Sequence, residues 1–222
     1  MPIQKHVNKD FFKKWSPDMA YILGFFCADG SLTINPRGSH YMDFHMTDKT
    51  LLQDIRRVMS SNHKLVERRR SHKWSPLYRL QIGSKEMCND LQNLGVHERK
   101  TYTMTVPHVP KEYFSDFVRG YFDGDGNVWM GEIHKKRKTQ LLTIQTGFTS
   151  CSNGFLTSLR DELSKMGIHG SVYKRKGENA FRLQFSIKGS IMLYQLMYKD
   201  LSSDLFLNRK KKVFEKYINM RR

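Results

Sequence analysis

The apolar and polar positions along the first half of the chain predict helices and strands in a regular order. Apolar residues recur at helical spacing in three segments, and each segment follows a residue suited to cap a helix: Ser16, Asp48 and Ser84. Residues with period-two alternation lie between these segments and are separated by polar turns, as in antiparallel hairpins. The predicted elements are a helix over 16–29, strands over 31–35 and 41–46, a helix over 48–59, strands over 64–70 and 77–82, and a helix over 84–94.

The second half predicts the same order of elements. They are a helix that begins near Pro110, strands over 127–133 and 141–148, a helix over 152–167, strands over 171–176 and 180–187, a helix over 192–197 and a basic helix over 209–218. Each half therefore reads α-β-β-α-β-β-α, which predicts an α+β fold with an antiparallel sheet in each half. Residues 105–110 contain two prolines and no periodicity, so we expect a linker there between halves spanning 1–104 and 111–222.

One segment occurs twice, at an offset of 96 residues. Tyr21-Ile-Leu-Gly-Phe-Phe-Cys-Ala-Asp-Gly30 aligns with Phe117-Val-Arg-Gly-Tyr-Phe-Asp-Gly-Asp-Gly126. Each copy predicts a helix with two small residues four positions apart, a spacing that lets helix backbones approach closely. Glycine costs about 0.8–1 kcal/mol in a helix interior, so two such copies favour a helix interface. Its candidate residues are Gly24, Ala28, Gly120 and Gly124.

Each copy ends in an acidic residue, Asp29 in the first and Asp125 in the second. If the two helices pair as pseudo-symmetric partners, the two carboxylates arrive together at one end of the pair, where they repel each other unless a cation lies between them. Mg²⁺ is a hard cation that one or two carboxylates and substrate phosphates can hold. The pattern therefore favours metal-assisted hydrolysis of phosphodiesters.

The charge balance indicates a polyanionic partner. The 222-residue chain carries 38 Lys and Arg against 21 Asp and Glu, a formal net charge of +17, which favours nucleic acid. No apolar run approaches the roughly 20 residues of a membrane span, and the N-terminus lacks a signal-peptide pattern. The three scattered cysteines exclude a disulfide framework and a cysteine-based zinc site. We expect an intracellular protein of a reducing compartment, either a prokaryotic cytoplasm or an organelle matrix.

The segments 22–30 and 118–126 resemble the two signature motifs of single-chain LAGLIDADG homing endonucleases. The predicted order of elements covers nearly the whole chain and is similar to that family's fold, in which each half has a saddle-shaped antiparallel sheet and the motif helices pair. The resemblance implies a monomer that cuts a long asymmetric site in double-stranded DNA with Mg²⁺ and leaves short 3′ overhangs. It also implies that Mn²⁺ or Ca²⁺ can occupy the same site, and that a mobile intron or intein encodes the protein.

The resemblance assigns the metal ligands. The family's metal-binding residue is the last acidic residue of each motif, which matches Asp29 and Asp125. The backbones of Ala28 and Gly124 are further candidates. Cys27, which aligns with an aspartate of the second copy, is not predicted to be a ligand.

The resemblance also implies catalytic residues outside the motifs. A polar residue on the second strand of each half helps to position water in the family, and His45 and Thr149 align there. A lysine near the end of each half approaches the scissile phosphate, which points to Lys100 and to Lys210, with Lys211 as the alternative register.

Basic and amide side chains follow the predicted strands and their turns. Arginine suits guanine and glutamine suits adenine in the major groove, although for any one of these residues a nonspecific phosphate contact is the simpler expectation. The candidates for DNA contact are Asn35, Arg37, His40, Arg68, Arg70, Arg79, Gln81, Lys136, Lys138, Gln140, Gln145, Lys174, Arg182 and Gln184.

Two alternatives bear on this interpretation. Residues 123–127 superficially suggest an EF-hand, but the sixth and twelfth loop positions are Val128 and His134 instead of Gly and Glu. A binder that does not cut, such as a maturase of intron RNA, shares the basic composition. Retention of aspartate in both motifs favours cleavage, because loss of either would remove a metal ligand.

Overall fold

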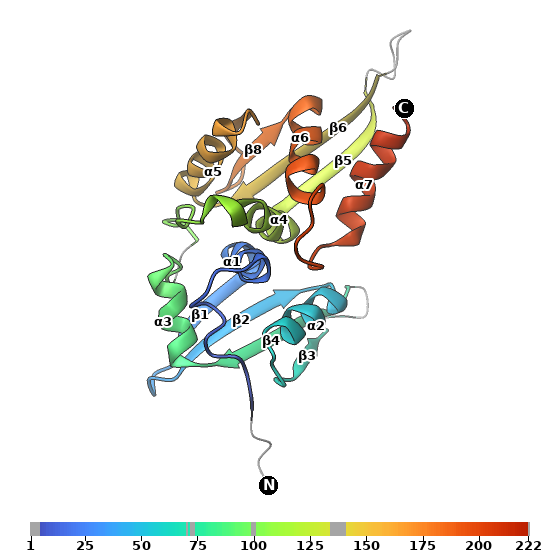
Figure 1. The fold of residues 1–222 in the computed structure, drawn as a ribbon. Helices are drawn as coiled ribbons and strands as arrows, with labels where there is room; N and C mark the ends of the chain where they lie inside the picture. The colour runs from blue at the N-terminus through green and yellow to red at the C-terminus, as the bar shows by residue number, and fades with distance from the viewer. Residues whose placement is uncertain (1–4, 70, 72–73, 99–100, 134–140, 222) are drawn as a thin grey trace. The chain divides into compact units, whose positions relative to one another are not determined.

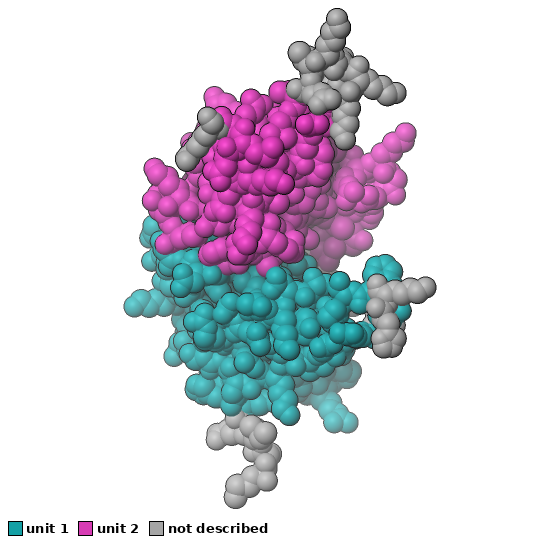
Figure 2. All heavy atoms as spheres, turned by 90° about the vertical axis from the view of Figure 1, so that its right-hand side faces the viewer, with its two compact units in different colours: residues 1–100, 107–124, 202–205 teal, residues 101–106, 125–201, 206–222 magenta. Residues whose placement is uncertain are grey.

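The computed structural model describes residues 5–69, 71, 74–98, 101–133 and 141–221. The fold divides into two compact units (Figure 2), and each is described by itself. Unit 1 comprises residues 1–100, 107–124 and 202–205, and unit 2 comprises residues 101–106, 125–201 and 206–222.

Unit 1 is built on a four-stranded antiparallel sheet, called sheet A, with strand order β1-β2-β4-β3 (Figure 1). Its helices α1, α2 and α3 all pack against strands of this sheet. The bounds are α1 Pro17–Asp29, β1 Gly30–Ile34, β2 His40–Met46, α2 Lys49–Val58, β3 Leu65–Arg68, β4 Leu77–Gly83 and α3 Lys85–Asn93.

Unit 2 repeats this plan with sheet B, whose strand order is β5-β6-β8-β7. Helices α5, α6 and α7 pack against this sheet. The bounds are β5 Gly126–Ile133, β6 Leu141–Ser150, α5 Asn153–Lys165, β7 Gly170–Lys174, β8 Phe181–Phe185, α6 Ile187–Tyr198 and α7 Asn208–Asn219.

The compact units do not coincide with the two sequence repeats. After the short 3₁₀ helix Lys111–Tyr113, helix α4 spans Phe114–Asp125, and all of it except Asp125 belongs to unit 1. The reason is that α4 packs directly on α1, as the helix interface predicted from the small residues requires. The boundary predicted at 105–110 refers to the duplication of the sequence, whereas the units describe packing.

Alternation along the strands separates a core face from an outer face in each sheet. On β2, Met42, Phe44 and Met46 are buried on the face that carries the helices, and the intervening residues lie on the outer face. On β6, Ile144 and Phe148 occupy the core face in the same way. The outer faces of the two sheets are where side chains are free to contact a ligand.

The fold class is confirmed: the structure is α+β, with a four-stranded antiparallel sheet in each of two similar halves. The helix starts follow the predicted caps, since the hydroxyl or carboxylate oxygens of Ser16, Asp48, Ser84 and Ser152 each accept a hydrogen bond from the first turn of their helices.

The largest difference between the predicted and the observed elements concerns residues 180–198. The predicted strand over 180–187 ends at Phe185, and the predicted helix over 192–197 begins five residues earlier, at Ile187. The physical reason is Ser186, whose hydroxyl accepts a hydrogen bond from the Gly189 amide and caps α6. The apolar run through Ile187 looked like one continuous strand, although it contains this cap.

Candidate functional site

The motif helices α1 and α4 pack with their backbones in contact, and this contact depends on two glycines. A Cβ atom at Gly24 would lie 2.1 Å from the carbonyl oxygen of Phe117, and one at Gly120 would lie 1.9 Å from the carbonyl oxygen of Tyr21. No side chain fits at such distances, so both positions require glycine. The repeat of small residues is therefore an interface between helices.

The close packing continues to the last turn of both helices. A Cβ at Gly124 would lie 2.4 Å from the Cβ of Ala28 and 3.3 Å from Oδ2 of Asp29. Asp29 is the last residue of α1, and Gly30, the C-cap, begins β1. The carboxylate of Asp29 thus lies beside the residue that precedes Asp125 in the sequence.

The two motif aspartates occupy equivalent local positions. Asp29 and Asp125 are the last residues of α1 and α4, each is half-buried, and each is followed by a buried glycine that begins the first strand of a sheet. A carboxylate at the negative end of a helix dipole is unfavourable, and neither helix has a basic residue in its last turn. These carboxylates are suited to a cation.

Lysine candidates differ in their surroundings. Lys210 on α7 is 7% exposed, and its Nζ donates a hydrogen bond of 2.6 Å to the carbonyl oxygen of Gly126, the residue after Asp125. Lys211 instead lies over the Phe206 ring, 5.0 Å from its centroid, and 3.6 Å from Glu215. Lys100 lies outside the described residues. Of the two registers in the second half, Lys210 is the one beside the motif.

His45 and Thr149 lie at equivalent positions on the outer faces of the sheets. In register, His45 pairs with Arg79 of β4 and Thr149 pairs with Arg182 of β8. Burial lowers the pKa of His45, Arg79 and Arg68 lower it further, and Asp43 opposes them. His45 is therefore mainly neutral at pH 7, and a ring nitrogen can accept a proton or a hydrogen bond.

The outer face of sheet A carries a polar cluster that joins two strands. Asp43, whose side chain is 3% exposed, forms an ion pair of 2.6 Å with Nε of Arg79. Its second oxygen accepts a hydrogen bond of 3.3 Å from the amide of Gln81. A cavity of about 1100 Å³ lies next to the cluster, lined by His45, Thr47, Arg68, Arg69, Trp74, Ser75 and Leu77.

Other DNA-contact candidates of the first half lie at the ends of strands. Asn35 and exposed Arg37 lie in the β1–β2 turn. There the side-chain oxygen of Asn35 accepts hydrogen bonds from the backbone amides of Arg37 and Ser39. His40 lies on the core side of β2, in register with Ile34, and thus not on the face of Arg79. Arg68 is exposed on the outer side of β3, while Arg70 lies outside the described residues.

The outer face of sheet B has a different cluster. Arg182 donates from Nε to Gln184, over 2.6 Å, and from Nη2 to Asn127, over 2.7 Å. Gln145 is exposed on the same face, and Lys174 is exposed at the end of β7. Lys136, Lys138 and Gln140 lie outside the described residues.

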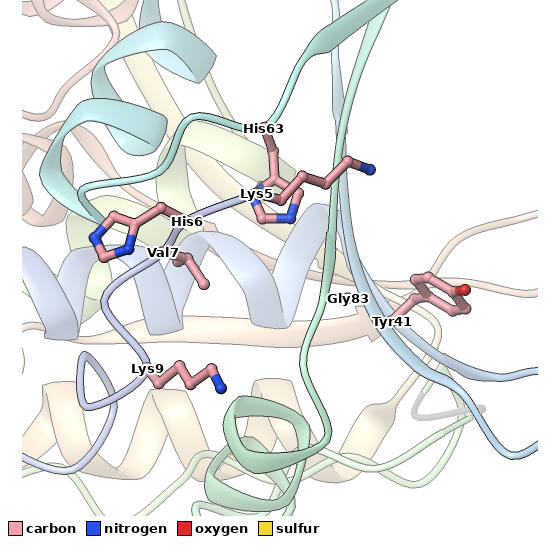
Figure 3. Close-up of a pocket in the computed structure, with 7 residues that line it drawn as sticks. All are labelled: Lys5, His6, Val7, Lys9, Tyr41, His63 and Gly83. Atoms are coloured by element: carbon pink, nitrogen blue, oxygen red, sulfur yellow. The ribbon is translucent and has the colours of Figure 1, made fainter. Parts of the chain in front are cut away.

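A smaller cavity in unit 1, of about 340 Å³, is lined by basic side chains near one end of the central strands β2 and β4. Lys5, His6 and Lys9 of the N-terminal segment line it together with Tyr41 of β2, and in Figure 3 the Tyr41 ring points away from these three side chains. His63 lines this cavity and bonds to the Ser61 hydroxyl at 2.9 Å. Burial, aided by Lys5, lowers the pKa of His63, so the positive charge here comes chiefly from the lysines.

Sequence reasoning missed the residues that organise the outer faces. Asp43 and Asn127 were not among the candidates, yet they hold Arg79 and Arg182. The available signal was the triplet Arg-Leu-Gln, which occurs at 79–81 and again at 182–184. Its partners lie on other strands, so only the register of the sheets reveals them.

Within the part of the chain that the structure describes, no group of three or more His, Cys, Asp or Glu side chains is placed to hold a metal ion. No helix among the described residues is long and apolar enough to span a membrane.

Comparison with curated proteins finds archaeal relatives. An uncharacterized protein of Methanocaldococcus jannaschii is 23% identical over 208 residues, 89% of this chain and 64% of that protein. The DNA-directed RNA polymerase subunit Rpo1C of the same organism is 27% identical over 113 residues, 50% of this chain and 13% of the subunit. The chain thus spans less than two thirds of the length of both relatives.

Solved structures of meganucleases share the fold. The I-SmaMI meganuclease bound to uncleaveable DNA has a TM-score of 0.63 and 11% identity, with 92% of this chain and 90% of that chain covered. The I-SmaMI LAGLIDADG homing endonuclease bound to cleaved DNA has a TM-score of 0.61 and 11% identity, covering 93% and 89%. I-SmaMI bound to uncleaved DNA in the presence of calcium ions has a TM-score of 0.60 and 10% identity, covering 93% and 90%.

The sequence profile of the LAGLIDADG-like domain matches this chain twice, at residues 16–95 and 112–191. Each match begins at the start of a motif helix or within five residues of it and extends through the sheet of its half. The two matches cover more than half of the chain, so the protein belongs to the LAGLIDADG family.

Proposed function

We propose that the protein is a site-specific endonuclease that cuts both strands of a long asymmetric DNA site and leaves short 3′ overhangs. The observation that carries the proposal is the equivalence of Asp29 and Asp125: each ends a motif helix, half-buried, and leads directly into a sheet with a polar outer face. Two such carboxylates provide one acidic group for each strand of a duplex. Family membership and the likeness to DNA-bound I-SmaMI support the same activity.

The donor set fits a hard divalent cation. Asp29 and Asp125 supply oxygen ligands at the negative ends of two helices, and such ligands suit Mg²⁺, with Mn²⁺ or Ca²⁺ able to take the same place. The backbone carbonyls of Ala28 and Gly124 are additional oxygen donors in the same turns. The bound cation would neutralise charge that develops on the attacked phosphate and lower the pKa of attacking water.

The remaining candidates act on the water and the phosphate. His45, held mainly neutral by burial, accepts a hydrogen bond or proton from water on the first strand of DNA, and Thr149 orients water at the equivalent position. Lys210, anchored on the Gly126 carbonyl, places a positive charge beside the motif of the second half. Lys100 is proposed for the same role in the first half.

The outer faces of sheets A and B bind the duplex. They carry the polar clusters of Arg79 and Arg182, and the chain has a net charge of +17, so DNA binding weakens steeply with salt as counterions are displaced. We propose that one chain suffices, because its internal repeat already supplies two motif helices and two sheets. Encoding by a mobile intron or intein is proposed on the family resemblance alone.

The test is cleavage by variants that change only the charge of the motif residues. Asp29→Asn and Asp125→Asn preserve side-chain size, and each is expected to reduce double-strand cleavage in Mg²⁺ below about 1% of the parental rate. DNA affinity in the absence of metal should stay equal or rise, because a carboxylate that faces phosphate is removed. The substrate is found by selection from a randomised duplex library.

Asp161→Asn is the matched control, since the Asp161 side chain is exposed on α5 and forms an ion pair with Arg160. It should cut at the parental rate. Parental cleavage by Asp29→Asn contradicts the catalytic assignment. Absence of cleavage by the parent, together with tight binding of intron RNA, supports a maturase instead.

A further inference from the structure

The two sheets carry the same triplet in the same register. Arg79-Leu80-Gln81 lies on β4 with Leu80 opposite Phe44, and Arg182-Leu183-Gln184 lies on β8 with Leu183 opposite Phe148. In each sheet the leucine is buried in the core and the two polar residues lie on the outer face. The triplets are equivalent positions of the repeat, so a difference between them must come from their neighbours.

In sheet A the neighbour is a carboxylate. In register, Asp43 of β2 lies directly opposite Gln81 and diagonal to Arg79. It holds Nε of Arg79 at 2.6 Å and the amide nitrogen of Gln81 at 3.3 Å. Among the described residues, the two terminal nitrogens of Arg79 have no hydrogen-bond partner. The guanidinium is therefore fixed at Nε, with its outer edge available.

In sheet B the equivalent neighbour is Gly147, opposite Gln184. A Cβ there would lie 2.9–3.0 Å from three guanidinium atoms of Arg182, so the guanidinium lies across the bare backbone of Gly147. Nη2 donates to Asn127 and Nε to Gln184. The amide of Gln184 in turn donates to the carbonyl of Thr146, over 3.1 Å. Both side chains are occupied by neutral partners within the sheet.

These arrangements have different consequences for reading a base. Guanine offers O6 and N7 as two acceptors side by side, which match two donors on one edge of a guanidinium. Arg79 presents both terminal nitrogens, held in place by Asp43. In Arg182 one of the two N–H groups of Nη2 is already donated to Asn127 and the Nε–H to Gln184, so turning this guanidinium toward a base strains or breaks those bonds and reduces the gain.

We propose that Asp43 is a positioning residue that makes Arg79 a specific reader of guanine, and that the absence of its counterpart at Gly147 leaves the related base position weakly read. The inference rests on the proposed function, since it assigns specificity to the same DNA-binding faces. Asp43 is itself 3% exposed beneath Arg79, so it acts through the arginine and does not touch the base. The duplicated fold thereby discriminates unequally between the two half-sites.

The charge balance around the two arginines leads to a second expectation, which concerns the salt dependence of DNA binding. Asp43 compensates the charge of Arg79, whereas the hydrogen-bond partners of Arg182 among the described residues are the amide oxygens of Gln184 and Asn127. Arg182→Ala should therefore reduce the salt dependence of DNA binding by about one unit of slope. Arg79→Ala should change the slope less and the base preference more.

The experiment is selection of bound duplexes from a randomised library without divalent metal, followed by sequencing. The parent should enrich sites with one strongly preferred guanine in the half-site of sheet A. Asp43→Asn, which keeps side-chain size, and Arg79→Lys, which keeps charge but lacks the two-donor edge, should each weaken that preference about tenfold. Preferences at the other positions should persist, as should all preferences in the control Asp54→Asn, which alters an exposed ion pair on α2.

The reverse substitution tests the other sheet. Gly147→Asp should displace the flexible end of Arg182, pair with it, and create a guanine preference at the position related by the repeat. If the Asp43→Asn variant enriches the same guanine as strongly as the parent does, the inference is overturned, while the proposed function stays intact. A parent that enriches no sequence overturns the proposed function first. If Gly147→Asp does not fold, the Asp43→Asn and Arg79→Lys comparison decides alone.

Discussion

Helices α1 and α4 carry the same motif, yet they bury different chemistry. The buried residues of α1 run from Met19 to Cys27 without a charged side chain. Those of α4 include Asp116, Arg119 and Asp123. The shared features are the glycines and the terminal aspartates, so duplication has preserved the interface and the acidic ends, while buried charged side chains occur on α4 and not on α1.

The shared glycines are expected to have the largest effect on stability. Gly120→Ala places a Cβ 1.9 Å from a backbone oxygen of α1, and Gly24→Ala is equivalent, at 2.1 Å. Neither backbone can move without separating the helices, so each should lower the free energy of unfolding by at least about 4 kcal/mol. Thermal or urea unfolding of the purified protein measures this.

Gly154→Ala is the matched control. Gly154 lies in helix α5, and the nearest atoms to its Cβ position are 3.7–3.9 Å away, which is ordinary contact. Alanine is better than glycine in helices by about 0.8–1 kcal/mol, so this variant should be as stable as the parent or slightly more so. Equal unfolding curves for the Ala variants at 120 and 154 would contradict the role of the interface.

Arg119 tests the feature that α4 does not share with α1. Its side chain is 1% exposed and pairs with Asp116 at 2.6 Å. Nε donates to the carbonyl of Leu205, and the guanidinium lies 5.4 Å from the centroid of the Tyr21 ring. Arg119→Met leaves the carboxylate of Asp116 buried without its cation, so the free energy of unfolding should fall by about 3–5 kcal/mol.

An Arg–Asp ion pair on the protein surface provides the control. Arg57 and Asp54 on α2 have the same spacing and a distance of 3.0 Å, but Arg57 is 69% exposed. Arg57→Met should therefore cost less than about 1 kcal/mol. Comparable losses of unfolding free energy in Arg119→Met and Arg57→Met would mean that burial does not make the Arg119 pair more important for stability than the Arg57 pair.

The stability of the Arg119→Met variant should depend on pH. Burial already raises the pKa of Asp116 although Arg119 lowers it, and removal of Arg119 raises it further. A carboxyl group with a raised pKa in the folded state stabilises the fold below its unfolded pKa, and this contribution is lost as pH rises through the folded pKa. The deficit of the variant should thus be smaller at about pH 4.5 than at about pH 7.5. A deficit that is independent of pH would exclude an uncompensated Asp116.

Sequence reasoning reached the parts of this molecule that local pattern determines. Helix starts could be predicted from single capping residues such as Ser16, and the role of Gly24 from the repeat of small residues. The polar clusters could not be predicted, because Asp43 and Arg79 are 36 residues apart in the sequence and meet only through strand register. Arg119 and Asp116 show the spacing of an exposed helical pair, and their burial, with Arg119 in contact with Leu205 and the Tyr21 ring, arises from tertiary packing.

The smallest effect on stability is expected where the two copies of the motif differ by a single hydrogen bond. The hydroxyl of Tyr21 donates to Asp123 over 2.7 Å, with both residues buried. Alignment of the motifs places Phe117 at the position of Tyr21 and Cys27 at the position of Asp123. The repeat therefore has one polar and one apolar version of the same pair.

Tyr21→Phe removes the donor and leaves a buried carboxylate with one fewer hydrogen bond, which should cost about 1–3 kcal/mol. Replacing both members, as Tyr21→Phe with Asp123→Cys, reproduces the apolar version that the other copy already contains. Because exchanging both partners for apolar groups of similar shape is close to neutral, the double variant should be more stable than Tyr21→Phe alone. A double-mutant cycle from unfolding curves measures the coupling. Additive losses would show that the two pairs are not interchangeable, and that the second copy depends on the carboxylate of Asp123 for more than its bond to Tyr21.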